Sequence, residues 1–385
     1  MMKTKKITDN SAFKFLVLVC LPVILVAVCQ TRLPNYYRSL FSLFLINVIL
    51  TSSLNLTNGF TGIFSIGHAG FMAIGAYISS LLTLSAETKA ARIENAPQWL
   101  VSLHVPFPAA IIIAGLIAMG LAALVGFPIL RAKGDYLSVM TLGLVIIIKS
   151  VIDNNPNITN GSKGLGGMKG YSTLPVTFCV TVLVLYLLHK IVRSSFGRTM
   201  IAIRDDSPAA VSLGINVLKY RVLSFALSAF FGAAGGAMWA HLQKTIASSF
   251  FYLGESFDIV QMSVLGGMFT LSGSIPGALI ITFLPQVLSR LESGFTLFGY
   301  TFPNMYGLSE IIMCIIFICV LIFRPNGIMG SSDYIIDGIF DSRTYTGLFQ
   351  KETWKELFSA VKPRSNIKKT KVKATGTVKE QEGTL

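Results

Sequence analysis

Three stretches without a single charged side chain constrain this chain more than any other feature. Residues 39–86, 105–130 and 259–289 contain no Asp, Glu, Lys or Arg over 48, 26 and 31 residues respectively. About 20 apolar residues suffice for a helix to cross a bilayer, and each run is longer than that. Only 13 % of the 385 residues are charged, against about 25 % in soluble domains. The sequence therefore predicts an all-α, polytopic membrane protein.

Breaks within these runs divide the chain into about ten crossings. A helix rises about 1.5 Å per residue, so the 48-residue run must hold two spans, separated by a break at residues 55–62. A first span is expected in the apolar stretch that follows the N-terminal lysines, because no small-residue cleavage site comes after it. Residues 85–104 are expected to form a polar loop. The expected spans are residues 13–29, 39–56, 62–84, 105–130, 136–152, 173–191, 222–242, two short or broken spans in 257–289, and 307–323.

The distribution of basic residues predicts the orientation. Ten crossings place both termini on one side, and with the N-terminus inside, the inner loops carry twelve Lys and Arg against eight in the outer loops. Cytoplasmic loops are the ones enriched in Lys and Arg, so both termini are expected in the cytoplasm. Residues 1–38 are then a basic segment with the first span, residues 39–330 the transmembrane domain, and residues 331–385 a basic cytoplasmic tail, partly disordered.

The chain lacks the residues that catalysis would require. The expected spans hold very few ionisable side chains, no His/Asp/Glu pattern for a metal, and no facing catalytic pair. The chain also has no phosphate-binding glycine loop followed by Lys and Ser or Thr, so it cannot hydrolyse ATP alone. We expect a transport protein, with no cofactor or metal of its own and no proton relay. The net charge of +14 is spread over loops and tail, which argues against nucleic acid as a partner.

One polar stretch, residues 193–221, interrupts the apolar chain with local structure of its own. Ser207 is a good N-cap and Pro208 suits the first helical position. Gly214 suits the left-handed residue that ends a helix, and Asp205 and Asp206 lie where negative charge favours a helix start. The stretch predicts a short capped helix on the cytoplasmic side. Either a docking element for a soluble partner or a well-capped surface turn would give this pattern.

Two glycine-interrupted regions, residues 55–75 and 266–277, fall in matching places in the two halves of the chain. Unwound backbone inside a membrane is tolerated only where it faces protein or water, so broken helices at such positions indicate a transport path near the midplane. Glycines also serve close helix packing, and His68 could equally be a hydrogen-bonded packing residue. The candidate path residues are Gly62, Ser65, Gly67, His68, Gly70, Gly266 and Gly267.

Several motifs occur together and in a characteristic order between residues 40 and 330. They are Thr61-Gly62-x-x-Ser65-x-Gly67-His68-Ala69-x-Phe71, Gly134-Asp135-Tyr136-Leu137 with Thr141-Leu142-Gly143, Asn154-Asn155 to Thr159-Asn160-Gly161, Phe196-Gly197-Arg198 to Ser212-Leu213-Gly214-Ile215-Asn216, Leu265-Gly266-Gly267, and Phe323-Arg324-Pro325-x-Gly327. Together they resemble the branched-chain amino acid ABC importer permeases of LivM type, within the LivH and LivM family.

The resemblance implies a subunit of the inner (plasma) membrane, surrounded by membrane lipid. It implies that the chain pairs with a second permease of the same family, two cytoplasmic ATP-binding subunits and a periplasmic or extracellular solute-binding protein. The matching glycine-interrupted regions in the two halves, together with the resemblance, predict an inverted repeat. The capped loop would be the coupling helix, with Ala209-Ala210 and Gly214 matching the family's loop core; Pro208 stands where the broader motif has an acidic residue. The residues implied in coupling are Arg204, Asp205, Asp206, Ser207, Ala209, Ala210 and Gly214.

Three functions follow from these observations. The first is ATP-driven import of leucine, isoleucine or valine. The second is import of urea or a short-chain amide, because permeases of that kind share these motifs. Close relatives often have Glu near position 146, where this chain has Ile, so the exact substrate stays open. The third is a channel or scaffold that needs no ATPase.

Overall fold

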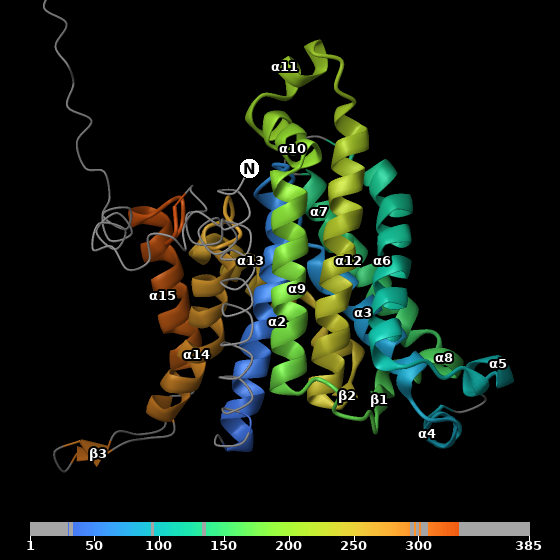
Figure 1. Cartoon of the computed structure of the whole chain (residues 1–385). Coiled ribbons are helices and arrows are strands. Elements are labelled where there is room, and N and C mark those ends of the chain that lie inside the picture. The colour runs from blue at the N-terminus through green and yellow to red at the C-terminus, as the bar shows by residue number, and fades with distance from the viewer. Residues whose placement is uncertain are drawn as a thin grey trace, which may run out of the picture. The chain divides into compact units, whose positions relative to one another are not determined.

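Helices make up nearly all of the chain that the structure describes (Figure 1). The structure is a computed structural model that describes Gln30 and residues 34–93, 96–132, 136–292, 296–297, 300–301 and 307–330. By its contacts the chain divides into residues 1–341 and 342–385. The expected first span, the basic N-terminal segment and the tail from residue 331 lie outside the described residues.

The first uncharged run folds as two helices with an irregular segment between them. Helix α2 (Asn35–Asn58) is followed by residues 59–67, and helix α3 (His68–Thr83) begins only after them. The expectation that a helix starts at residue 62 is therefore wrong. Gly62 adopts the left-handed region, with φ of +73°, and neighbouring side chains bond the polar backbone groups of the segment, as described below.

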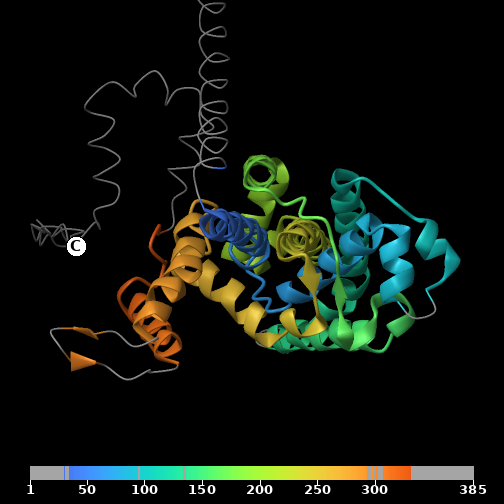
Figure 2. The same cartoon turned by 90° about the horizontal axis from the view of Figure 1, so that it is seen from below.

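Helix α12 (Val217–Gln243) lies at the centre of the bundle, where it packs against α2, α3 and α6 (Phe107–Ile129). In Figure 2 it lies beside α2, with α14 and α15 beyond α2 on the other side. Small residues bring its backbone close to α3. A Cβ added to Gly236 would lie 2.0 Å from the carbonyl oxygen of Met72, and one on Gly75 would lie 2.0 Å from that of Ala233. Small residues allow such close helix packing inside membranes.

Three helices form an outer layer. They are α6, α7 (Tyr136–Asp153) and α9 (Leu174–Arg193). Only 22 % of the apolar stretch of α7 is buried within the chain, against 78 % of that of α12. Their exposed side chains are apolar, such as Leu124 and Ile147, which is the surface that a lipid environment requires.

The C-terminal helices are joined to α2 by polar pairs. Helices α13 (Leu253–Gly266) and α14 (Ser274–Glu292) divide the third uncharged run, as expected, and α15 (Leu308–Phe323) packs on α14. Asn47 Nδ2 donates to Thr282 Oγ1 at 2.8 Å, and the Ser52 and Ser274 hydroxyls lie 2.7 Å apart. A two-stranded ribbon of β3 (Thr296–Leu297) and β4 (Tyr300–Thr301) follows α14.

Short elements cover one end of the bundle, the lower end in Figure 1. The expected polar loop at residues 85–104 instead contains helices α4 (Ala86–Arg92) and α5 (Gln98–Ser102). Lys89 joins them: its fully buried ammonium donates to the carbonyl oxygens of Leu100, at 3.0 Å, and Leu103. Burial lowers the pKa of Lys89. The residues that follow α7 form α8 (Pro156–Thr159), the 3-10 turn η1 (Gly161–Lys163) and strand β1 (Leu165–Gly166).

Strand β1 pairs antiparallel with β2 (Thr245–Ile246), which follows α12, and Leu165 stands opposite Ile246. A second 3-10 turn, η2 (Ser248–Phe250), leads into α13. The opposite end of the bundle carries helices α10 (Ser195–Asp205) and α11 (Ser207–Ser212), at the top of Figure 1.

The described residues contain five helices that are long and apolar enough to cross a membrane, namely α2, α6, α7, α9 and α12. A sixth is reached if α3 and α4, which meet at a bend of 118°, count as one span. The apolar part of α14 and helix α15 are shorter. The chain is thus a multi-pass, helical membrane protein, and its described part accounts for five or six spans rather than ten.

Candidate transport path and coupling loop

Asn58 supports the irregular segment at residues 59–67, called here the first break. Its Nδ2 donates to the carbonyl oxygen of Ser65 at 3.1 Å, and its Oδ1 accepts from the Ser65 amide at 3.0 Å. One buried side chain thus bonds both backbone groups of a residue outside any helix. Because unpaired backbone groups are costly in a membrane, this pair stabilises the unwound conformation.

Helix α7 supports the same segment from the other side. Thr141 Oγ1 accepts from the Ile66 amide at 3.1 Å, and Ser138 Oγ donates to the carbonyl oxygen of Phe64 at 2.8 Å. A Cβ on Gly67 would lie 2.8 Å from the Thr141 carbonyl oxygen. A helix from a different part of the chain therefore holds the break in place.

A second break, residues 267–273, separates α13 from α14. Gly267 has φ of +120°. The turn after α15 packs on it: the amides of Ile328 and Met329 donate to the carbonyl oxygens of Leu265 and Gly266, at 3.0 and 3.1 Å. Two separate sequence motifs, Leu265-Gly266-Gly267 and the one ending in Gly327, thus meet in space.

The two breaks lie against each other. A Cβ on Gly59 would lie 1.6 Å from the carbonyl oxygen of Met268, so only glycine fits this approach. One turn earlier in α2, Asn55 Nδ2 donates to the carbonyl oxygen of Thr270 at 2.9 Å, and Asn55 Oδ1 accepts from Ser263 Oγ at 2.5 Å. Segments more than 200 residues apart in sequence therefore form one junction, as broken helices do at the centre of transporters.

All seven candidate path residues lie at or beside these breaks. Gly62, Ser65 and Gly67 are in the first break, and Gly266 and Gly267 are at the start of the second. Gly70 lies in the first turn of α3, where a Cβ would approach Ile148 of α7 to 2.7 Å.

His68, the first residue of α3, is held in a packed position. Its buried ring places Nε2 2.6 Å from Ser53 Oγ in α2. A Cβ on Gly232 of α12 would lie 2.7 Å from the same nitrogen. This geometry favours the interpretation of His68 as a hydrogen-bonded packing residue between three helices.

A groove of about 380 Å³ lies elsewhere, between α6, α10 and α12. Neither break contributes to its lining, which is Met119, Gly120, Ala123, Phe196, Leu223, Ala226 and Leu227. No group of three or more His, Cys, Asp or Glu side chains that could hold a metal ion occurs in the part of the chain that the structure describes.

The polar loop between α9 and α12 consists of two helices. The short helix α11 was expected, but its cap is Asp206, whose Oδ1 accepts from the Ala209 amide at 2.9 Å. The prediction of Ser207 as the N-cap is thus wrong by one residue, because the longer carboxylate side chain at 206 reaches the free amide. Gly214 ends the turn with φ of +80°, as expected.

The surface of α11 carries exposed apolar side chains. Leu213 is 81 % and Val211 59 % exposed, whereas Ala210 is buried against the loop. The other implied coupling residues are distributed over the two helices: Arg204 and Asp205 end α10, and Ser207 and Ala209 lie in α11.

Helix α10 was missed by sequence reasoning. Ser194 caps it by accepting from the Gly197 amide at 3.3 Å, and its buried side is formed by Gly197, Met200 and Ile203. The spacing of these three residues is helical and could have indicated the element. Phe196 stacks on Tyr220 of α12, with ring centroids 5.5 Å apart.

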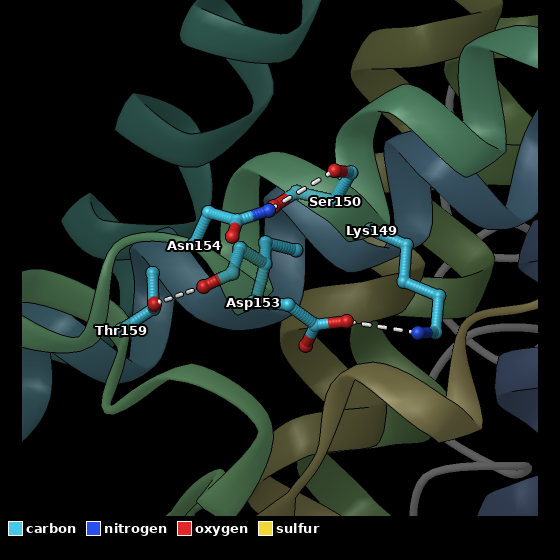
Figure 3. Close-up of polar contacts among 6 residues, drawn as sticks. Lys149, Ser150, Asp153, Asn154 and Thr159 are labelled. Atoms are coloured by element: carbon cyan, nitrogen blue, oxygen red, sulfur yellow. Dashed lines mark hydrogen bonds and ion pairs between the residues drawn. The ribbon is translucent and has the colours of Figure 1, made fainter.

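The Asn-rich motif after α7 forms an ordered end for that helix (Figure 3). Asn154 Nδ2 donates to the carbonyl oxygen of Ser150 at 2.8 Å, and Thr159 Oγ1 donates to that of Ile152 at 2.5 Å. Lys149 Nζ lies 2.8 Å from Asp153 Oδ2. These contacts close the chain back onto the last turn of α7, so this motif is structural in the described conformation.

Together these features define a class: a multi-pass helical membrane protein with two helix breaks that meet in its interior and a folded loop at one end. Comparison with known proteins gives the family. Residues 36–321 match the family described as "Branched-chain amino acid transport system / permease component". The chain therefore belongs to the branched-chain amino acid transport permeases, and it is the permease component of such an ABC transport system rather than an enzyme.

Individual relatives agree with this assignment. The chain is 28 % identical over 322 residues to the high-affinity branched-chain amino acid transport system permease protein LivM of Escherichia coli strain K12, covering 75 % of this chain and 68 % of the relative. The chain is 23 % identical over 310 residues to a probable LivM permease of Methanocaldococcus jannaschii, covering 73 % of this chain and 89 % of the relative. It is 24 % identical over 303 residues to LivH of Salmonella typhimurium, covering 73 % of this chain and 90 % of the relative. No solved structure matches the chain.

Proposed function

We propose that this chain imports leucine, isoleucine or valine across the inner (plasma) membrane, with no cofactor bound to it. Its partners would be a second permease of the same family, two cytoplasmic ATP-binding subunits and an external solute-binding protein. The observation that carries this proposal is the junction of the two breaks within the residues that match the family. Broken helices mark the substrate path in many transporters, and a path with few charged side chains suits a small substrate whose side chain is apolar or neutral.

The proposed topology has about ten crossings, both termini in the cytoplasm, and the two breaks at equivalent positions of an inverted repeat. In this orientation α10 and α11 face the cytoplasm, where ATP-binding subunits would dock. Support comes from the exposed Leu213 and Val211 on α11, and from the excess of Lys and Arg in the loops assigned to that side.

The transport proposal is tested with the complete transporter in liposomes. We expect uptake of radiolabelled leucine that requires ATP and the solute-binding protein, and that unlabelled isoleucine and valine inhibit. Competition by urea or a short amide instead would favour the amide permease. Solute flux without ATP would favour a channel and contradict the proposal.

The docking surface is tested by Leu213→Asp, with Leu213→Met as the matched control. Because Leu213 is 81 % exposed, neither change disturbs a packed core. A carboxylate in an apolar contact should weaken binding of the ATP-binding subunits by at least about tenfold, equivalent to about 1.4 kcal/mol, and reduce uptake accordingly. Co-purification of the subunits with this chain measures the effect. Equal recovery with both variants would show that α11 is not the docking surface.

A further inference from the structure

The buried side of α10 contacts both helix breaks, although α10 lies outside the expected transport path. Met200 is fully buried, in an apolar cluster with Leu56 at the end of α2, Phe60 in the first break and Leu271 in the second. The hydroxyl of Thr61 in the first break donates to Met200 Sδ at 3.3 Å. The loop that carries α11 therefore rests directly on the junction of the two breaks.

Arg204, in the last turn of α10, makes a specific contact with each break. Its Nη1 donates to the carbonyl oxygen of Gly59 in the first break at 3.1 Å. Its guanidinium carbon lies 5.2 Å from the ring centroid of Phe269 in the second break, within the range of a cation–π interaction. One side chain thus connects the loop to two segments that are more than 200 residues apart.

The neighbouring residues fix the position of this guanidinium. Asp205 Oδ1 accepts from Arg204 Nε at 2.9 Å and lies 2.8 Å from Nη2. A Cβ on Gly62 would lie 2.8 Å from Arg204 Cγ, so the glycine leaves room for the side chain. The planar guanidinium can bond a carboxylate on one edge while another nitrogen bonds a carbonyl and its face covers a ring, which a lysine ammonium cannot do.

Arg204 is also close in sequence to the exposed helix. Asp206 both follows α10 and caps α11 through the Ala209 amide. A displacement of α11 must therefore be passed to the end of α10 through Asp206, the single residue between the two helices. Coupling between distant sites requires such a contiguous set of contacts.

We propose that Arg204 is a positioning residue that transmits displacement of α11 to both helix breaks. The inference rests on the proposed function, and it assigns Arg204 to contacts inside this chain rather than to the surface that meets the ATP-binding subunits. Asp205 holds the guanidinium in place, and a displacement of the guanidinium shifts its two contacts, the ring of Phe269 and the carbonyl of Gly59.

The first test measures ATP hydrolysis and leucine uptake together in the complete transporter. We expect Arg204→Ala to retain ATP hydrolysis while uptake per ATP falls by about tenfold, within the range of measured allosteric couplings. Arg204→Lys should be intermediate, because it keeps the charge but not the planar contacts. Phe269→Leu should lower uptake per ATP, and adding it to Arg204→Ala should cause little further loss, since both changes break one contact.

Arg198→Ala is the matched control. Arg198 lies on the same helix, but it is exposed and bonds only the nearby Arg193 carbonyl and Ser195 hydroxyl among described partners, at 3.1 and 2.9 Å. Its removal should leave uptake per ATP unchanged. If Arg204→Ala lowers hydrolysis and uptake in the same proportion, or lowers neither, the inference is wrong.

A second readout does not depend on the substrate. Phe64 in the first break is 44 % exposed, so Phe64→Cys, in a variant without the native cysteines, reports access to the break. In the protein that keeps Arg204, trapping the ATP-binding subunits with ATP and vanadate should change the rate at which maleimide modifies this cysteine by about fivefold or more. In the protein that also carries Arg204→Ala, trapping should leave that rate unchanged. An ATP-dependent change without leucine uptake would contradict only the proposed substrate. An equal change in both proteins would contradict the role of Arg204.

Discussion

Individual polar side chains make the unwound segments possible. Asn58 bonds the amide and carbonyl of Ser65, and Asn55 bonds the carbonyl of Thr270 across to the second break. An unsatisfied backbone group in a membrane interior costs several kcal/mol. The side-chain amides of the two asparagines therefore make the hydrogen bonds that water would make to such groups in a soluble protein. The requirement explains why asparagines occur inside an uncharged run.

Replacing Asn58 should therefore destabilise the fold. In Asn58→Ala, both backbone groups of Ser65 lose their partner, and we expect a loss of about 1–3 kcal/mol in the free energy of unfolding. Asn154→Ala is the matched control, because Asn154 is exposed and bonds only Ser150, within its own helix end. Exposed substitutions usually change stability by less than about 0.5 kcal/mol. Denaturation of the purified proteins in detergent gives the comparison, and equal stability of the two variants would contradict this account.

Helices α3 and α12 illustrate what the sequence can and cannot predict about an element. Separate apolar stretches bounded by charged or polar residues predicted both helices, and α12 begins five residues before the expected start at residue 222. The start of α3 was placed six residues too early, since Gly62 to Gly67 look as apolar as the helix that follows, and only the partners Asn58 and Thr141 favour the unwound form. Composition alone does not show such partners. The glycines at the breaks could be found from the sequence because they interrupt apolar stretches, whereas the Arg204 contacts join segments far apart in the sequence and could not.

The close approach of α12 to α3 can be tested at Gly236. A Cβ there would lie 2.0 Å from the Met72 carbonyl oxygen, so Gly236→Ala must push two backbones apart, at a cost of about 1–3 kcal/mol. Gly143→Ala is the matched control: Gly143 lies in α7 with nothing within 4 Å of an added Cβ. Alanine favours a helix over glycine by about 0.5–1 kcal/mol, so this variant should unfold at the same or a higher temperature. Identical melting temperatures for both variants would show that the approach is looser than described.

At the scale of the whole molecule, the two ends of the bundle differ in character. One end carries the short elements α4, α5, α8 and the β1–β2 pair, and the other carries α10 and α11 (Figure 1). Transport by alternating access requires that the site at the breaks, between these two ends, opens to only one side of the membrane at a time. The proposed function therefore depends on which end faces the cytoplasm, and the excess of basic residues predicts that it is the end with α10 and α11.

Site-directed labelling measures this orientation directly. Leu213, 81 % exposed, marks the α11 end, and Trp99, 61 % exposed in α5, marks the other. In a variant without Cys20, Cys29, Cys179, Cys314 and Cys319, we expect a membrane-impermeant maleimide to label Trp99→Cys in intact cells. Leu213→Cys should react only after the membrane is permeabilised, because α11 would then be on the protected side. Labelling of Leu213→Cys from outside intact cells would show the opposite topology. It would then contradict the proposal that cytoplasmic ATP-binding subunits act through α11 and Arg204.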